Sequence, residues 1–403
     1  MGEVFDGKRA FEHIEKLSAI KRLPGTPGET QAQEYIKGVG DDIGVPMRWE
    51  EFTYSSAPLT VVLPLVSLLL GIACIMGSLT YLWETSLSII LGVVLLVMIY
   101  LGFKWSAAFE HFGATSGSKK SLNLIGEIKG EDPRGTIILS AHYDSKSQLM
   151  PVVVRAGLYI VGFFTAILLG LALVVVGILS LAGADAFGSR AGFFISLFPA
   201  VCLVLLVFNF TGNRSAGALD NASGEAVILE AARVIAREPL KNHDMLVASF
   251  GCEEVGLCGA INYLLAHEEE LKARPTYMLN FDMPFSTGGN IFVNTAFELP
   301  PRYTSKYINE LARKAAADKG LKIKGLYMPV GAAADHMPWN KHGIEATGFV
   351  SAAGFIHSSR DSVDKINREG LQRTGEVTLA VVRSIDQEVP PAPGSAARGV
   401  EDR

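Results

Sequence analysis

Charged residues are scarce in this sequence. Only 19% of its 403 residues are charged, whereas typical globular proteins have about a quarter. Four cysteines are too few for a disulfide-rich secreted scaffold, and a formal net charge of -5 gives no basic field for nucleic acid. The hydrophobic content of 49% excludes a disordered chain. We therefore expect a folded protein without a nucleic-acid partner, whose apolar excess lies either in one large core or in a membrane.

The apolar residues are concentrated in long uncharged runs. A membrane-spanning helix needs about 20 mostly apolar residues, and four runs reach or approach that length: Leu59–Met76, Ser88–Phe103, Ala156–Leu181 and Ala191–Phe210. Helices buried in a soluble core seldom run this far without a charge on one face. The sequence therefore predicts a multi-pass integral membrane protein whose four helices cross the lipid bilayer as two hairpins, with turns at Tyr81–Ser86 and Gly183–Ser189.

Each predicted insertion is a pair of helices, so the remaining pieces of the chain lie on one side of the membrane. Lys and Arg near the helix ends are more frequent on that side (Arg48, Lys104, Lys119, Lys120, Lys146, Arg155 and Arg214) than in the turns, which have only Arg190. The positive-inside rule then favours a cytoplasmic soluble domain. Residues 1–55 are charged and amphipathic, so no signal peptide is expected there.

The polar pieces alternate between helical and strand patterns. Predicted helices cover Lys8–Ala19, Glu29–Ile43, Ala222–Arg237, Gly259–Ala273 and Glu376–Val389, and predicted strands cover Met47–Phe52, Ser121–Lys129, Thr136–Ser140, His243–Phe250 and Thr276–Phe281. This alternation predicts an α/β fold, a three-layer sandwich around a mixed, mostly parallel sheet, with the two transmembrane hairpins inserted. The expected divisions are a soluble domain made of 1–56, 107–150 and 214–389, hairpins at 57–106 and 151–213, and a disordered tail at 390–403.

Polar residues gather where the predicted strands end, which is where working residues collect in open α/β sheets. They occur in His142-Tyr143-Asp144, Gly217–Gly224, Glu253-Glu254, Asp282, Ala334-Asp335-His336 and His357–Asp361. Imidazole and carboxylate ligands suit divalent metals, Zn²⁺ above all. Two metals about 3.5–4 Å apart need a bridging carboxylate, and a spare Glu beside a ligand Glu can take a proton from water. The pattern therefore indicates a hydrolytic metal centre.

With these motifs the chain resembles the two-zinc aminopeptidases of the bacterial leucyl aminopeptidase and vacuolar aminopeptidase type, which are related to glutamate carboxypeptidase. The motifs are Leu23–Gly28, which resembles the family's Pro-Gly turn, His142–Asp144, Gly217–Gly224, Glu253–Leu257, Asn280–Met283, Ala334–His336 and His357–Asp361. They follow the family's order and cover almost all of the soluble residues. One departure is Leu219, which replaces the first Asp of the family's Asp-Asp-Asn, and another is the pair of hairpins.

The resemblance implies two Zn²⁺ per chain, for which Co²⁺ or Mn²⁺ could substitute. The implied ligands are His142, Asp220 and Asp282 for one ion, and Asp220, Glu254 and His357 for the other. Glu253 would be the general base and then the acid that protonates the leaving amine. Asp144 would hold the ring of His142, as metal-bound His generally requires. The residue that steadies the oxyanion is not identified, and Tyr327 and His336 are only candidates, for which a structural role is equally expected.

The function that this resemblance implies is a membrane-bound, zinc-dependent aminopeptidase that hydrolyses N-terminal residues of peptides with a metal-activated water. The alternatives are a carboxypeptidase or dipeptidase, a glutaminyl cyclase-like acyltransferase that uses one zinc, and a non-catalytic receptor-like member. The full ligand set favours two metals and hydrolysis. The hairpins either bring the site close to the bilayer, where it takes membrane-proximal peptides, or only anchor the enzyme or build a homo-oligomer. Cys252 and Cys258 are expected as reduced thiols beside the site.

Overall fold

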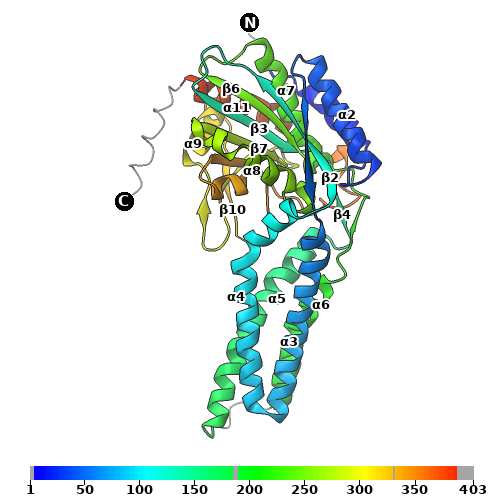
Figure 1. The fold of residues 1–403 in the computed structure, drawn as a ribbon, viewed down its shortest axis with the longest axis vertical. Helices are drawn as coiled ribbons and strands as arrows, with labels where there is room; N and C mark the ends of the chain where they lie inside the picture. The colour runs from blue at the N-terminus through cyan, green and yellow to red at the C-terminus, as the bar shows by residue number, and fades with distance from the viewer. Residues whose placement is uncertain (1–3, 185–188, 330–331, 388–403) are drawn as a thin grey trace, which may run out of the picture. The chain divides into compact units, whose positions relative to one another are not determined.

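A computed structural model describes residues 4–184, 189–329 and 332–387. The chain divides into two compact units, and each is interleaved with the other along the sequence. The first unit comprises Met1–Tyr54, Ala114–Ser147 and Gly212–Arg403, and the second comprises Ser55–Gly113 and Gln148–Thr211 (Figure 1). We call them the sheet unit and the helical unit, and each is described by itself.

The sheet unit is built on a nine-stranded mixed sheet. Its strand order is β1-β2-β6-β3-β7-β11-β8-β10, with β9 paired to β8. The strands are β1 (Arg48–Tyr54), β2 (Lys119–Ile128), β3 (Gly135–His142), β6 (His243–Phe250), β7 (Thr276–Asp282), β8 (Phe292–Phe297), β9 (Arg302–Tyr303), β10 (Lys324–Met328) and β11 (Glu345–Val350). The central block β6-β3-β7-β11 is parallel, whereas the β1–β2, β2–β6 and β11–β8 pairs are antiparallel.

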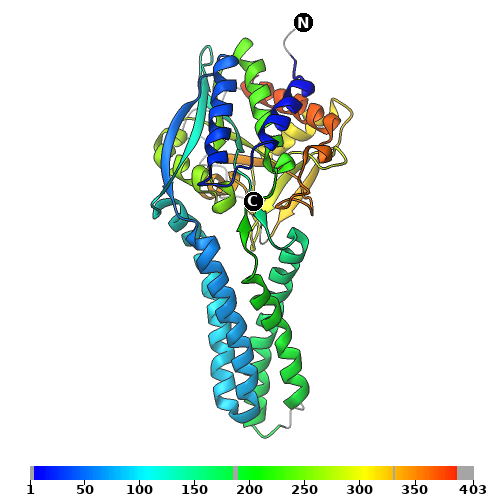
Figure 2. The same ribbon diagram turned by 90° about the vertical axis from the view of Figure 1, so that its right-hand side faces the viewer.

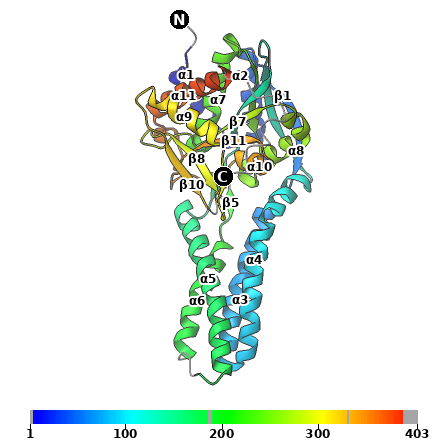
Figure 3. The same cartoon turned by 90° about the vertical axis from the view of Figure 1, so that its left-hand side faces the viewer.

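Helices cover both faces of this sheet, which gives the predicted three layers. One group, which packs together on one face, is α1 (Gly7–Ser18), α7 (Ser223–Arg237), α9 (Lys306–Ala317) and α11 (Arg368–Gln387). The other group is α8 (Cys258–Ala273) and α10 (His336–Lys341), and α2 (Pro27–Asp42) packs against β2. Figure 3 shows α8 and α10 on the opposite side of the strands from α1, α9 and α11. The α/β expectation is confirmed.

Local sequence explains where the main elements begin and why the centre of the sheet is buried. The side chain of Asp6 caps α1 by accepting hydrogen bonds from the main-chain N–H groups of Lys8 and Arg9. Pro27 occupies the first turn of α2, where its missing N–H is no loss. Strand β3 is buried along its whole length, as expected of a parallel strand covered by helices on both faces. Its end at His142 is therefore held rigidly.

The helical unit contains α3 (Leu63–Trp83), which continues from a π-helical turn at Pro58–Val62, with α4 (Thr85–Thr115), α5 (Val152–Leu181) and α6 (Ser189–Leu206). Within this unit α3 and α4 run beside α5 and α6 (Figure 2). Glycines allow α4 and α5 to approach closely, because a Cβ on Gly92 would lie 2.9 Å from the carbonyl oxygen of Gly170. The packed helices leave many large apolar side chains exposed on their outer surfaces.

Three of these helices are long and apolar enough to cross a membrane: Pro58–Trp83, Thr85–Gly102 and Val152–Leu181. For the fourth predicted span, Ala191–Phe210, the described residues include a shorter apolar helix, Leu197–Leu206. The three spans therefore agree with the sequence interpretation, whereas the count of four and the cytoplasmic orientation stay predictions. The tail at 390–403 lies outside the described residues. Strands β4 (Ser147–Gln148) and β5 (Thr211–Gly212) form a separate two-stranded sheet.

Candidate metal centre

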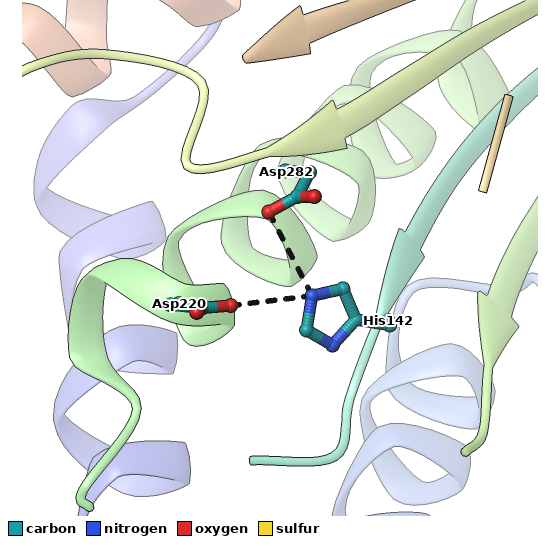
Figure 4. A group of neighbouring side chains, drawn as sticks. All are labelled: His142, Asp220 and Asp282. Carbon is teal, nitrogen blue, oxygen red and sulfur yellow. Dashed lines mark ion pairs between the residues drawn. The ribbon is translucent and has the colours of Figure 1, made fainter. Parts of the chain in front are cut away.

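The predicted ligands come together at the carboxyl ends of the central strands. His142 is the last residue of β3 and Asp282 is the last of β7, and these two strands pair in parallel. Asp220 lies in the irregular turn Ala218–Ala222 that leads into α7. The three side chains point toward one another in Figure 4. The sheet thus supplies two of the ligands, and a loop that crosses its edge supplies the third.

His142, Asp220 and Asp282 form the first of two triads, here called site A. The Nε2 atom of His142 lies 3.4 Å from Oδ1 of Asp220 and 3.8 Å from Oδ1 of Asp282. All three residues are buried, and their ligand atoms lie within 4.8 Å of one another. This spacing leaves room for one ion between an imidazole nitrogen and two carboxylate oxygens.

The second triad, site B, consists of Asp220, Glu254 and His357. The Nε2 atom of His357 lies 3.1 Å from Oδ2 of Asp220 and 3.1 Å from Oε2 of Glu254. Asp220 therefore offers one carboxylate oxygen to each site, which is the arrangement that a bridging ligand requires. All five predicted ligands are brought together in the two overlapping triads.

The donor atoms fit a divalent metal. His142 Nε2 and Asp282 Oδ1 are buried and make no hydrogen bond, although buried polar atoms nearly always have a partner. Imidazole nitrogens and carboxylate oxygens in groups of three with an open position are typical of catalytic zinc sites. The two triads could therefore hold zinc at His142, Asp220 and Asp282, and at Asp220, Glu254 and His357.

Asp144 connects the two sites through the main chain. One of its carboxylate oxygens accepts a hydrogen bond from the N–H of Glu253 and the other accepts one from the N–H of Glu254, both at 3.1 Å. Its Oδ1 atom also lies 3.5 Å from Nδ1 of His142. The main-chain carbonyl oxygen of Asp144 is closer to this nitrogen, at 3.2 Å, so Asp144 contacts the ring of His142 mainly through its main chain, and the predicted ring-holding role of its carboxylate stays a prediction. The carboxylate holds the Glu253-Glu254 pair, which the sequence did not indicate.

Glu253 faces site A without belonging to either triad. Its Oε2 atom lies 3.9 Å from Nε2 of His142. Burial raises the pKa of Glu253 well above its ordinary value, and the nearby carboxylates of Asp282 and Glu254 raise it further, against the opposing effect of His142. By contrast, the imidazoles of His142 and His357 outweigh burial and lower the pKa of Asp220. Two carboxyl groups with pKa values pushed in opposite directions fit a proton carrier and a ligand.

Two residues that sequence analysis left without a role hold the loop of Asp220. The carboxylate of Asp361 accepts hydrogen bonds from the N–H groups of Leu219 and Asp220 at 2.8 and 3.1 Å. The amide of Asn221 donates to the carbonyl oxygen of Phe281 and accepts from the N–H of Met283, so it joins the Asp220 turn to the end of β7. Asp361 belongs to the quoted His357–Asp361 segment, but spacing does not reveal a partner in the main chain.

The two oxyanion candidates have other partners in the structure. Tyr327 is half-exposed on β10, and its hydroxyl donates to the carbonyl oxygen of Glu298. His336 is fully buried, and its Nε2 atom lies 3.0 Å from Oδ1 of Asn294. Burial lowers the pKa of His336 to about 3, which leaves it a neutral core residue. Among the described contacts neither side chain touches the triads.

Cys252 and Cys258, which flank the glutamates, are free thiols and fully buried. Burial raises the pKa of each, well above its ordinary value for Cys252 and to about 12 for Cys258. A thiol with so high a pKa is not ionised near neutral pH and is therefore a poor nucleophile and a poor metal ligand. Both cysteines thus pack behind the glutamates as small apolar residues.

Comparison with known proteins agrees with this geometry. Residues 200–382 match peptidase family M28. The chain is 33% identical over 189 residues to aminopeptidase YwaD of Bacillus subtilis (strain 168), an alignment that covers 44% of this chain and 40% of the relative. The chain spans less than half of the length of the curated relatives it matches.

Solved structures share the fold. A zinc aminopeptidase from Bacillus subtilis superposes with a TM-score of 0.56 at 16% identity, covering 94% of this chain and 95% of that one. A glutaminyl cyclase from an Acidobacteriales bacterium superposes with a TM-score of 0.57 at 15% identity, covering 96% and 97%. Sequence match, fold and the two triads agree: residues 200–382 match peptidase family M28, and the chain shares its fold with solved zinc aminopeptidases.

Proposed function

We propose that the protein is a membrane-anchored, zinc-dependent aminopeptidase that removes N-terminal residues from peptides. The observation that carries the proposal is the pair of triads that share Asp220, with Glu253 beside site A. Two zinc ions held in the two triads would supply Lewis acidity to polarise the scissile carbonyl and to make water more acidic.

Glu253 would act as the proton carrier of the reaction. Its raised pKa lets the carboxylate accept a proton from the attacking water and return it to the departing amine near neutral pH. The carboxylate of Asp144 accepts a hydrogen bond from the N–H of Glu253, and its main-chain carbonyl oxygen lies 3.2 Å from Nδ1 of His142, so the base and the first ligand keep one geometry. Asp361 and Asn221 hold the bridging Asp220 in the same way.

The glutaminyl cyclase-like alternative has a specific observation in its favour, the similarity of fold to solved cyclases. That similarity is at 14–15% identity and concerns the fold alone. A cyclase that uses one zinc has no need of a second complete triad, and two groups of three donors, each of which could hold an ion, support the two-metal proposal. The ligand set therefore supports hydrolysis as the leading proposal.

The helical unit would anchor the enzyme in the bilayer. Helices α3 and α5 are 21 and 30 residues long, and at 1.5 Å per residue each is at least as long as a hydrocarbon core of about 30 Å. Their outward side chains, such as Leu65, Ile72 and Leu168, are apolar and exposed, which is favourable only against lipid or another apolar surface. We propose four crossings with the sheet unit in the cytoplasm; cleavage of peptides close to the membrane is part of the same proposal.

The test is an assay of the full chain, purified in detergent, stripped of metal and reloaded with Zn²⁺. Four kinds of substrate separate the alternatives: peptides with a free N-terminal residue, the same peptides with an acetylated N-terminus, dipeptides that carry a C-terminal extension, and peptides with an N-terminal glutamine. We expect the protein to cleave only those peptides that have a free N-terminal amine. Glu253→Gln keeps the shape of the side chain and should lower kcat by about 10²–10⁴-fold while zinc stoichiometry stays unchanged.

Other outcomes would overturn parts of the proposal. Cleavage of acetylated peptides would exclude an aminopeptidase, and cyclisation of N-terminal glutamine without hydrolysis would favour the acyltransferase. Full activity of Glu253→Gln would exclude its role as proton carrier. A chain that binds zinc but converts none of these substrates would leave the receptor-like alternative.

A further inference from the structure

A lysine lies against site B. The Nζ atom of Lys146 is 2.9 Å from Oε2 of Glu254 and donates to the main-chain oxygen of Glu254 at 2.8 Å. The main-chain N–H of Lys146 donates to Oε1 of the same carboxylate at 3.2 Å. Only 13% of the Lys146 side chain is exposed, although lysines are mostly exposed in proteins. The ammonium group is thus fixed at a proposed ligand.

The oxygen that Lys146 approaches is also the one that faces the metal position. Oε2 of Glu254 lies 3.1 Å from Nε2 of His357, its neighbour in site B. A cation at 2.9 Å from this oxygen competes for the same lone pairs as a metal ion would. It also repels a second positive charge at short range in a water-poor environment, where Coulomb interactions are strong.

Site A has no such cation among the described contacts. The carboxylate of Asp282 has an ion pair with His142 and none with a lysine or arginine in the described part of the chain. Arg22 is the other buried cation nearby, but its described hydrogen bonds go to main-chain carbonyls. Arg22 influences Asp220, which both sites share, so it does not distinguish them. Each site has two carboxylates, and among the described residues only site B has an adjacent ammonium group.

We propose that Lys146 makes the two metal positions unequal, so that site A fills first and holds its ion tightly while site B fills last and exchanges its ion readily. The inference rests on the proposed function only in that both triads bind metal. It assigns Lys146 a positioning role toward Glu254, and the enzyme would need a higher free metal concentration for its second ion than for its first.

The experiment is a Co²⁺ titration of the metal-free full chain in detergent, followed by visible absorption and by elemental analysis of the bound metal. We expect two binding steps. Lys146→Met keeps the length of the side chain without its charge, and it should tighten the second step by about 10–100-fold while the first step changes by less than about twofold. Lys146→Arg keeps the charge and should retain the separation of the steps.

Two further variants fix the interpretation. Lys120→Met removes an equal charge from an exposed side chain paired with Glu51, and it should leave both steps unchanged. Asp282→Asn removes a ligand of site A only, so it should weaken the first step, and Lys146→Met should still tighten binding at site B in that background. If Lys120→Met shifted the second step as strongly as Lys146→Met, net charge rather than contact with Glu254 would be responsible and the proposal would fail.

The remaining outcomes are decisive as well. The inference is overturned if the native chain binds its two Co²⁺ ions with equal affinity, or if Lys146→Met leaves the two binding steps unchanged. Either result leaves the peptidase proposal intact. A native chain that binds one ion supports the inference if Lys146→Met gains a second, and overturns it otherwise. If the two metal-binding steps are unequal and change with Lys146→Met, but the chain cleaves no peptide, the inference is supported and the proposed function fails. A chain that binds no metal overturns both.

Discussion

Asp361 illustrates how a residue outside the metal position can set its geometry. Its two carboxylate oxygens accept the N–H groups of Leu219 and Asp220, and the side chain is fully buried. The Asp361 carboxylate thereby holds the main chain of Asp220, so both side-chain oxygens of Asp220 remain available to the two sites. Because the two N–H groups donate to different oxygens, a side chain with an acceptor oxygen at only one of these positions would leave one N–H group without its partner.

We therefore predict that Asp361→Asn weakens zinc binding. The new amide has one carbonyl oxygen, so its NH₂ group must face one of the two main-chain N–H donors, which leaves that donor unpaired. Affinity should fall by about 10–100-fold, measured by competition with a chelator of known affinity. Asp364→Asn is the matched control, because Asp364 is exposed and pairs with Lys365. An unchanged zinc affinity in Asp361→Asn would contradict the positioning role.

His336 gives a prediction about pH. Because burial lowers its pKa from 6.5 to about 3, the folded state binds fewer protons than the unfolded state between these pH values. The contribution of His336 to the free energy of unfolding is therefore fully present above pH 6.5 and is lost as the pH falls. Between pH 6.5 and 5 the loss amounts to about 2 kcal/mol.

The measurement is the denaturation midpoint of the full chain in detergent at pH 7 and pH 5. In His336→Gln, which can still bond to Asn294, the decrease on acidification should be smaller than in the native chain. His342→Gln is the control, because His342 is partly exposed at the end of α10. Equal decreases in native and His336→Gln chains would show that another group is responsible.

At the scale of elements, the turn before α2 joins the two segments that flank the second hairpin in sequence. The Arg22 side chain is fully buried and donates to five main-chain carbonyls, those of Leu17, Ile20, Tyr143, Ala216 and Gly217. Gly217 has φ +58, and a Cβ there would lie 2.6 Å from Arg22 Nη2. The turn thus holds the loop after His142 and the loop before Asp220 in one place, although a hairpin separates them in sequence.

We predict that Arg22→Met destabilises the sheet unit severely. Each buried carbonyl that loses its partner costs about 1–3 kcal/mol, so the free energy of unfolding should drop by at least about 3 kcal/mol. Denaturant unfolding of the full chain, followed by a signal from the sheet unit, is the measurement. Arg134→Met, which removes an exposed arginine paired with Asp132, should change stability little. A small effect of Arg22→Met would show that water replaces the lost donors.

Sequence patterns predicted the central elements best. The predicted strand His243–Phe250 has the same bounds as β6, and its short apolar run Met245–Ala248 is of the length that is typical of a buried strand. The last helix begins at Arg368 rather than Glu376, since its first two turns are polar on the surface. Helix α4 continues to Thr115, past the predicted span that ends at Phe103, because no Pro interrupts it when the composition becomes polar.

Motif spacing located the donors of both triads but not the residues that hold them. Zinc ligands come from a few residue types, mainly Cys, His, Asp and Glu, so their chemistry is visible in the sequence. Arg22, Asp361 and Lys146 act on main-chain atoms or on a neighbouring ligand, and such contacts depend on the folded geometry. The elements between Phe292 and Val350 were not delimited either, since β8 to β11 are short strands without a clear apolar period.

At the scale of the whole molecule, both insertions leave and re-enter the sheet unit without interrupting a strand of its sheet. The first lies between β1 and β2, which pair in an unbroken antiparallel register from Arg48–Ile125 to Tyr54–Lys119. The second lies between β3 and α7. The helical unit has its own buried cluster, which includes Leu70, Cys74, Leu95 and Leu203. Each unit therefore has a core of its own, which is the expected basis for a domain built from discontinuous segments.

The hairpin topology predicts which parts of the chain are accessible from each side of a membrane. If α3 and α4 cross as one pair and α5 and α6 as another, the turn at Glu84 and the segment at Ala184 lie on one side, and α1 lies on the other. All four native cysteines are buried, so the background reaction with a thiol reagent should be low. Single cysteines at the exposed positions Glu84, Ala184 and Lys16 therefore report the topology.

We expect a membrane-impermeant maleimide, applied to sealed vesicles, to label Glu84→Cys and Ala184→Cys from the same side and Lys16→Cys only from the opposite side. Detergent should expose all three, which controls for reactivity. The Ala184 variant is the decisive one, because the described apolar part of α6 covers only Leu197–Leu206, about half of the roughly 20 residues that a crossing needs. Labelling of Ala184→Cys from the same side as Lys16→Cys would mean that α5 does not cross as the first half of a hairpin, and labelling of Glu84→Cys from that side would exclude the first pair.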